Sequence, residues 1–117
     1  MRFAARPLLL ALLAALALAP SAHALTTSSG VAAGAGANDG AAADFNRDGH
    51  LDVATAHFAD GTVSILLGDG TGHFGAPLSI PTGSGPEFVA AGDFNADRNP
   101  DLAVGNGISG TISILLG

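Results

Sequence analysis

The chain contains no cysteine and only four basic residues, all arginine, against ten acidic residues in a length of 117. The absence of cysteine excludes disulfide bridges, thiolate metal sites and a cysteine nucleophile. The shortage of positive charge, with a formal net charge of −6, argues against nucleic acid as a partner. A chain of this length holds at most one modest domain.

The chain also lacks an apolar run long enough to cross a membrane. Its longest apolar segment, Leu8–Ala19, has twelve residues, whereas a transmembrane helix needs about 20. Two arginines precede this segment, a proline ends it, and Ala22 and Ala24 occupy the positions that signal peptidase recognises. This layout predicts a cleaved signal peptide at residues 1–24, a secreted or cell-surface location, and no membrane span after cleavage. The remaining chain keeps two arginines and all ten acids, a formal charge of −8.

An internal repeat with a period of 49 residues is the strongest pattern in the sequence. Residues 93–117 align with residues 44–68 without a gap, and 13 of the 25 aligned positions are identical. A period near 50 is typical of propeller blades or repeat arrays. The chain therefore divides into the segment 25–43, which is either a degenerate first strand or a linker, a repeat 1 at 44–92 and a truncated repeat 2 at 93–117.

Slightly under two repeats are too few for a self-sufficient repeat protein, because about three are normally needed to bury a continuous core. We therefore expect further repeats of the same protein to pack against this chain. A homo-oligomer of partial units is the less favoured alternative.

Short runs of β-forming residues, separated by glycine-containing turns, fill both repeats. In repeat 1 they lie at residues 53–58, 62–68, 78–80 and 88–92, and outside the signal segment no stretch shows the 3.6-residue periodicity of a helix. The sequence therefore predicts an all-β fold of antiparallel strands, about four to each unit, as in a propeller blade. Two incomplete blades of a larger propeller are expected to follow an N-terminal signal helix.

A nine-residue acidic loop occurs at the same place in each repeat. Side-chain oxygens occupy positions 1, 3, 5 and 9, and the backbone carbonyl at position 7 can supply another ligand. Carboxylates this close repel one another without a cation, and calcium prefers six to eight oxygen ligands. We therefore expect a calcium site in each loop; an ion-free Asp/Asn/Gly turn is the alternative. The expected ligands are Asp44, Asn46, Asp48, His50 (backbone) and Asp52 in the first loop, and Asp93, Asn95, Asp97, Asn99 (backbone) and Asp101 in the second.

The two loops differ at position 6, where the first has Gly49 and the second has Arg98. Glycine permits the positive φ that a tight wrap around an ion requires. A non-glycine residue in that conformation costs on the order of 1 kcal/mol, and arginine adds a positive charge near the ion. We therefore predict weaker calcium binding at the second loop.

In combination, these motifs resemble the FG-GAP/VCBS repeat family, whose blades form integrin-α-like β-propellers. The Phe-Gly and Gly-Ala-Pro elements behind the family name occur in HFGAP at 73–77, and VAAGDFNAD at 89–97 and LDVATAHF at 51–58 are also similar to the family. The resemblance covers residues 34–117. It implies that each acidic loop joins two strands of a blade and binds one calcium ion, and that the wider role is adhesion or ligand binding.

No catalytic constellation stands out in the sequence. His50, His57 and His73 lie in unrelated contexts, and Ser64 and Ser113 lie inside expected strands rather than at a strained turn. We therefore expect a non-catalytic, calcium-stabilised module with an extracellular protein or carbohydrate as its ligand. The alternative is an accessory propeller part of a secreted hydrolase or lyase whose catalytic domain lies beyond this chain.

Overall fold

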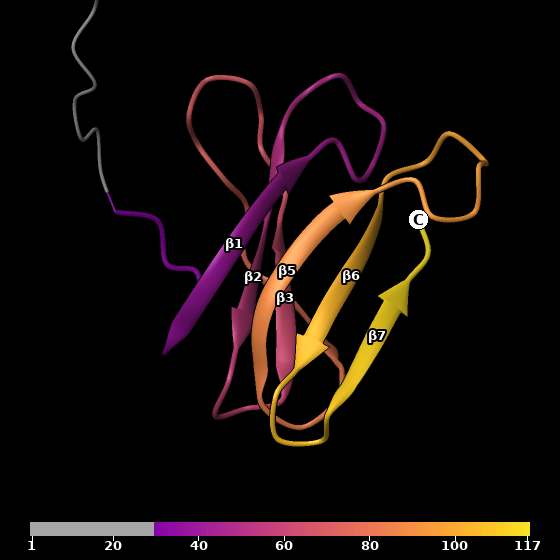
Figure 1. The fold of residues 1–117 in the computed structure, drawn as a ribbon. Helices are drawn as coiled ribbons and strands as arrows, with labels where there is room; N and C mark the ends of the chain where they lie inside the picture. The colour runs from indigo at the N-terminus through magenta and orange to yellow at the C-terminus, as the bar shows by residue number, and fades with distance from the viewer. Residues whose placement is uncertain (1–29) are drawn as a thin grey trace, which may run out of the picture.

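The computed structural model describes residues 30–117, and within that range it contains seven β-strands and no α-helix (Figure 1). This confirms the predicted all-β fold. No helix that could cross a membrane occurs in this part of the chain. The predicted signal peptide, residues 1–24, lies outside the described residues.

The strands form two antiparallel sheets, each of which follows the chain order as a meander. The strands of the first sheet are β1 (Ala37–Ala43), β2 (Asp52–His57), β3 (Thr62–Leu66) and β4 (Leu78–Pro81), and those of the second are β5 (Pro86–Gly92), β6 (Asp101–Asn106) and β7 (Thr111–Leu115).

The register of the two sheets repeats with the sequence. Val53 pairs with Leu66 between β2 and β3, and Leu102 pairs with Leu115, each 49 residues later, between β6 and β7. Each sheet begins one strand before its acidic loop, because β1 lies in the Gly/Ala-rich segment 25–43 and β5 lies at the end of the segment 44–92. Each sheet therefore starts one strand earlier in the chain than the sequence repeat to which it corresponds.

Equivalent glycines close the β2–β3 and β6–β7 hairpins. Gly61 has a φ of 66° and Gly110 a φ of 65°, a backbone conformation that glycine adopts without steric cost. The Gly61 amide donates to the carbonyl of His57 at 3.1 Å, and the Gly110 amide donates to that of Asn106 at 2.8 Å. Because glycine is kept at both positions, the two hairpins turn in the same way.

The core lies between the two sheets, which pack through opposite faces of the repeated unit. Alternation along a strand places one set of side chains on each face of a sheet. The first sheet packs with the face that carries Val63 and Ile65, whereas the second packs with the face that carries Leu102 and Val104, the counterparts of Val53 and Thr55. The buried cluster between the sheets consists of Ala54, Ala56, Val63, Ile65, Val89, Leu102 and Val104.

A buried polar residue ends the second strand of each sheet. The His57 ring is 2% exposed, with Nδ1 at 3.1 Å from the Ala35 carbonyl oxygen and Nε2 at 3.0 Å from Thr55 Oγ1. Its counterpart Asn106 is 1% exposed and accepts a hydrogen bond from the Gly83 amide at 3.2 Å. Both residues therefore fasten the chain segment that precedes their own sheet.

Shortening a core side chain between the sheets tests this packing. Val63 is fully buried, so Val63→Ala should lower the free energy of unfolding by about 2 kcal/mol, from lost apolar burial and the cavity left behind. Urea denaturation followed by circular dichroism measures the change. Leu78→Ala is the control, because Leu78 is 65% exposed, and an equal loss in the two variants would contradict the assignment of the core.

Candidate metal centre

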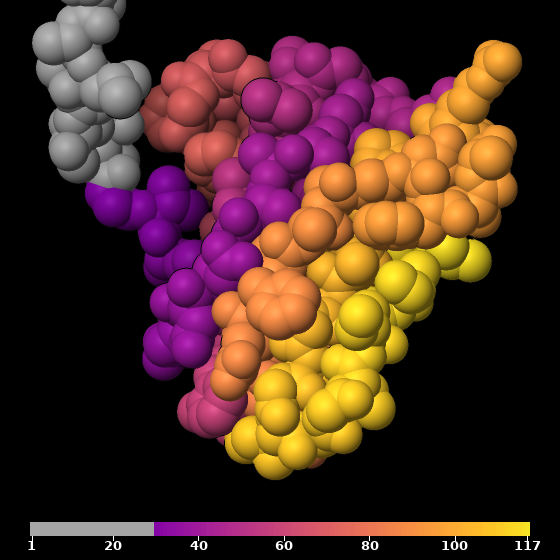
Figure 2. Space-filling view, in the orientation of Figure 1, coloured from indigo at the N-terminus to yellow at the C-terminus, as the bar shows by residue number. Residues whose placement is uncertain are grey.

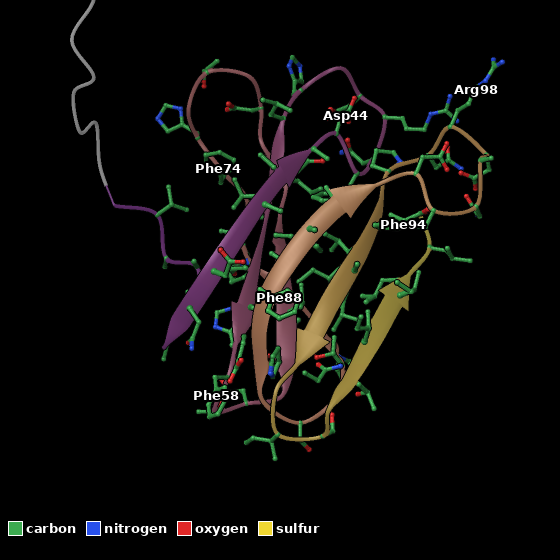
Figure 3. All side chains as sticks on the ribbon, in the orientation of Figure 1. Asp44, Phe58, Phe74, Phe88, Phe94 and Arg98 are labelled. Atoms are coloured by element: carbon green, nitrogen blue, oxygen red, sulfur yellow. The ribbon has the colours of Figure 1, made fainter. Side chains whose placement is uncertain are left out.

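The two acidic loops lie at the same end of the molecule, one after β1 and the other after β5. Figure 3 shows Asp44 of the first loop and Arg98 of the second at this end. The guanidinium of Arg47 in the first loop donates to Oδ1 of Asn99 in the second at 2.9 Å. The two loops are thus joined directly, by a contact between residues 52 positions apart in the chain.

The hydrogen bonds inside the first loop recur in the second, each 49 residues later. Asp44 accepts from the amides of Asp48 at 3.0 Å and Gly49 at 2.8 Å. Asp93 likewise accepts from the amides of Asp97 at 3.2 Å and Arg98 at 2.9 Å. In both loops, these hydrogen bonds hold the carboxylate at position 1 against the amides at positions 5 and 6.

The carboxylate at position 5 is held in its ionised form by the backbone. The His50 amide donates to Asp48 at 2.9 Å, and this hydrogen bond lowers the pKa of Asp48 below its usual value. The Asn99 amide donates to Asp97 at 2.9 Å and lowers the pKa of Asp97 in the same way. Both side chains therefore stay negatively charged, which suits them to attract a cation.

The carboxylate at position 9 is buried and holds each loop to its sheet. Asp52 is fully buried and accepts from the Phe45 amide at 2.8 Å and the Gly68 amide at 2.9 Å. Asp101 is 1% exposed and accepts from the equivalent amides of Phe94 and Gly117, both at 2.8 Å. Each oxygen of an ionised carboxylate has two lone pairs, so these hydrogen bonds leave capacity for a metal ion.

Each loop contains two residues with positive φ. At position 6, Gly49 has a φ of 88° and Arg98 a φ of 70°, so Arg98 adopts the left-handed conformation that the sequence predicted to be unfavourable there. At position 4, Arg47 and Ala96 have φ values of 59° and 61°. This second left-handed position could not be predicted from the sequence, because neither arginine nor alanine favours that conformation.

The second loop brings three of its predicted ligands together. Asp93, Asp97 and Asp101 each place one oxygen atom within 4.8 Å of the other two. In the part of the chain that the structure describes, the three carboxylates of the first loop do not lie this close together. Such a set of oxygen donors suits a hard divalent cation. For cation binding, the spacing of the carboxylates thus favours the second loop, whereas the presence of glycine at position 6 favours the first loop.

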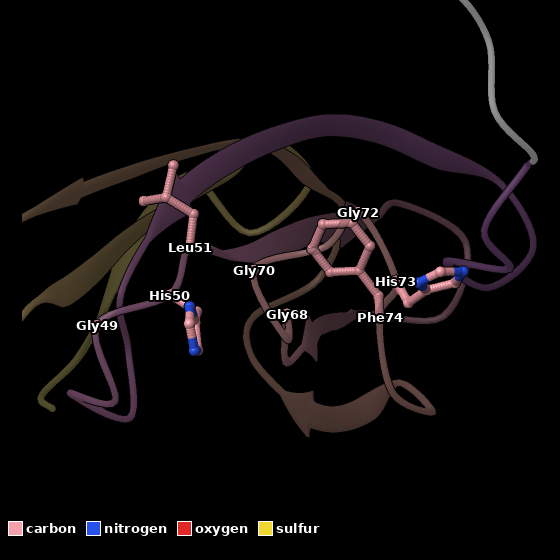
Figure 4. Close-up of a pocket in the computed structure, with 8 residues that line it drawn as sticks. All are labelled: Gly49, His50, Leu51, Gly68, Gly70, Gly72, His73 and Phe74. Carbon is pink, nitrogen blue, oxygen red and sulfur yellow. The ribbon is translucent and has the colours of Figure 1, made fainter.

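The Phe-Gly motif of the β3–β4 loop lies beside the first acidic loop. A hollow of about 380 Å³ separates the β3–β4 loop from the first acidic loop. His50 and Leu51 lie on one side of it, and His73 and Phe74 lie on the other (Figure 4). Gly70 has a φ of 81°, and a Cβ atom there would collide with the His50 ring, so a larger residue would strain the turn and displace the ring. Sequence reasoning placed a turn here but did not predict this contact.

Comparison with known proteins identifies one family. A family model described as FG-GAP-like repeat matches residues 44–104, a range that includes both acidic loops. Neither the curated proteins nor the solved structures gave a match to this chain.

Removing one acceptor from the buried carboxylate of the first loop should destabilise the fold. Asp52→Asn leaves one oxygen and one amide group opposite two amide donors, so one buried N–H loses its partner, at a cost of about 1–3 kcal/mol. Urea unfolding in the presence of a chelator measures this effect without metal. Asp60→Asn removes the same charge from an exposed turn, and equal unfolding midpoints for the two variants would contradict the role of Asp52.

Position 6 offers a reciprocal pair of substitutions. Arg98→Gly should raise the free energy of unfolding in chelator by about 1 kcal/mol, because glycine removes the cost of a left-handed side-chain-bearing residue. Gly49→Ala should lower it by a similar amount. A Cβ atom at Gly49 would meet no atom within 4 Å, so this change reports the backbone alone. Shifts of the same sign in both variants would refute the argument.

Proposed function

Because the chain belongs to the FG-GAP-like repeat family, we propose that it is a calcium-stabilised β-propeller-type module that works outside the cell. The observation that carries the proposal is the pair of acidic loops. The same pattern of hydrogen bonds occurs in each loop, and both loops lie at the same end of two equivalent sheets. The chemistry of the loops supports calcium in particular. Their donors are carboxylate, amide and carbonyl oxygens, and calcium accepts more such ligands, in a looser geometry, than magnesium.

The ligands that we propose for each ion come from positions 1, 3, 5, 7 and 9. In the second loop, three of these are the converging carboxylates of Asp93, Asp97 and Asp101. A bound ion would offset their mutual repulsion and hold the loop between two strands. In a chain without cysteine, calcium would thus take the stabilising role that disulfides have in many small secreted domains.

We propose a binding role rather than a catalytic one, with an extracellular protein or carbohydrate as the ligand. The environments of the histidines support this choice. His57 is buried and hydrogen-bonded to Thr55 and Ala35, which is a packing environment. His73 belongs to a turn in which Thr71 Oγ1 lies 2.8 Å from its Nδ1. Secretion is proposed from the signal-like segment at residues 1–24.

Thermal unfolding of residues 25–117 with calcium and with chelator tests the proposal. An ion present at about 100 times its dissociation constant stabilises a protein by about 2.7 kcal/mol. For a chain of this size, we therefore expect calcium to raise Tm by about 10 °C or more. Magnesium at the same concentration should raise Tm less.

Variants of the position 5 carboxylates complete this test. Asp48→Asn and Asp97→Asn should each remove part of the calcium-dependent increase, whereas Asp60→Asn, at an exposed turn outside both loops, should leave the increase intact. Identical melts of the parent chain in calcium and in chelator would disprove the proposal.

A further inference from the structure

The two acidic loops touch through one pair of side chains, Arg47 of the first loop and Asn99 of the second. Figure 2 shows the loops side by side at one end of the molecule, the first in purple and the second in orange. The Arg47 guanidinium donates to Oδ1 of Asn99 at 2.9 Å. Within residues 30–117 this guanidinium forms no ion pair. In an acidic chain, Arg47 thus contacts a neutral amide of the neighbouring loop rather than a carboxylate.

The side chain of Asn99 connects this contact to a carboxylate of its own loop. Its Nδ2 group donates to Oδ2 of Asp97 at 3.1 Å, and its backbone amide donates to Oδ1 of the same carboxylate at 2.9 Å. The Nδ2 group of Asn95 also donates to Oδ2 of Asp97, at 3.1 Å. Asp97, at position 5, is therefore held at both oxygens by three donors, and the Asn99 side chain that supplies one of them is itself held by Arg47. About four lone-pair sites on a carboxylate leave room for a cation as well.

The first loop lacks the corresponding hydrogen bond. At position 5, Asp48 accepts from the His50 amide at 2.9 Å and from Nδ2 of Asn46 at 3.2 Å, so it has two donors rather than three. The position 7 side chain is the His50 ring, which lies against Gly70 of the β3–β4 loop. At position 4 the second loop has Ala96, whose side chain has no donor to offer in return. The contact between the loops therefore supports the carboxylate of the second loop alone.

The loop that has this extra hydrogen bond is also the loop whose carboxylates converge. Asp93, Asp97 and Asp101 each place one oxygen within 4.8 Å of the other two, whereas the first loop, in the part of the chain described, has no such set. Positions 1 and 9 are held by equivalent amides in both loops. Position 5 is the carboxylate at which the two networks differ. Hydrogen bonds to a ligating carboxylate fix its orientation toward the metal ion, so this difference bears on ion binding.

The backbone of the first loop determines where the Arg47 side chain starts. Arg47 has a φ of 59°, a left-handed conformation, and it lies between Asn46 and Asp48, two of the ligands that we propose for the first loop. The Asp48 amide donates to Oδ1 of Asp44 at 3.0 Å, which fixes the chain directly after Arg47. The fold of the first loop thus directs this side chain toward the second loop.

We propose that Arg47 of the first loop is a positioning residue for calcium in the second loop. Through the side chain of Asn99, it holds the Asp97 carboxylate in the orientation that the ion requires. The inference rests on the proposed calcium-binding role and deepens it, because it makes the affinity of one site depend on a side chain of the other loop. The contribution of Arg47 passes through a hydrogen bond rather than through its charge.

The test has to separate this hydrogen bond from the charge of Arg47, because the two act in opposite directions. A guanidinium near a bound cation weakens binding by Coulomb repulsion. Asn99→Ala removes the side-chain hydrogen bonds without a change of charge and keeps the position 7 carbonyl. Arg47→Met removes both the charge and the donor. A double-mutant cycle of the two substitutions isolates the hydrogen bond, because the repulsion is lost equally with and without the Asn99 side chain.

Calcium titration of the full chain, followed by nuclear magnetic resonance, measures the dissociation constant at each loop separately. The position 6 amides of Gly49 and Arg98 report the first and the second loop, respectively. Asn99→Ala should raise the dissociation constant at the second loop by about two- to fivefold, and by less at the first. The effect of Arg47→Met on the second loop should be less favourable by a similar factor when the Asn99 side chain is present than when it is absent.

Arg98→Met is the matched control for charge. Arg98 belongs to the second loop itself, and its side chain points outward, away from the first loop (Figure 3). Arg98→Met should therefore change the affinity of the second loop by the same factor with and without the Asn99 side chain. Spectra in chelator add a readout without metal, in which Arg47→Met, but not Arg98→Met, should shift the Nδ2 proton signals of Asn99.

The possible failures of this experiment are distinguishable. If calcium shifts neither position 6 amide in the parent chain, the proposed calcium role fails, and the inference fails with it. If calcium binds but Arg47→Met has the same effect with and without the Asn99 side chain, the inference alone is overturned. Equal weakening of both loops by Asn99→Ala would also overturn it, because that result indicates a general loss of structure.

Discussion

The fold depends on one buried carboxylate in each repeat, at position 9 of the acidic loop. A buried charge is unfavourable unless its oxygens are hydrogen-bonded. Asp52 meets this requirement by accepting hydrogen bonds from an amide at the start of its own loop and from the amide of the second residue after β3, and Asp101 does the same in the second sheet. Each acidic loop is therefore fixed to the segment that follows the third strand of its sheet, β3 or β7.

This arrangement explains how a short chain without disulfides organises its negative charge. Six of the ten acids belong to the two loops, and both loops lie at one end of the molecule. The apolar side chains meet between the sheets, through opposite faces of the same repeated unit. Charge and core are thus separated along the strands.

The sequence predicted the strands and the repetition of the acidic loop well, because both follow from local patterns. The runs at 53–58 and 62–68 became β2 and β3, and the 49-residue period reappears in the register and in the loop hydrogen bonds. Contacts between residues far apart in the chain were not predictable in this way. The Arg47–Asn99 hydrogen bond depends on how the two sheets pack. The left-handed Ala96 also has no local signal, since alanine does not favour that conformation.

The central claim is that these loops are calcium sites, and the most direct test is the number of ions bound. Isothermal titration calorimetry of calcium into metal-free protein at neutral pH gives this number for the parent chain. The account predicts two ions per chain, with dissociation constants at or below the millimolar range of extracellular calcium sites. No heat of binding and no bound calcium at these concentrations would contradict it.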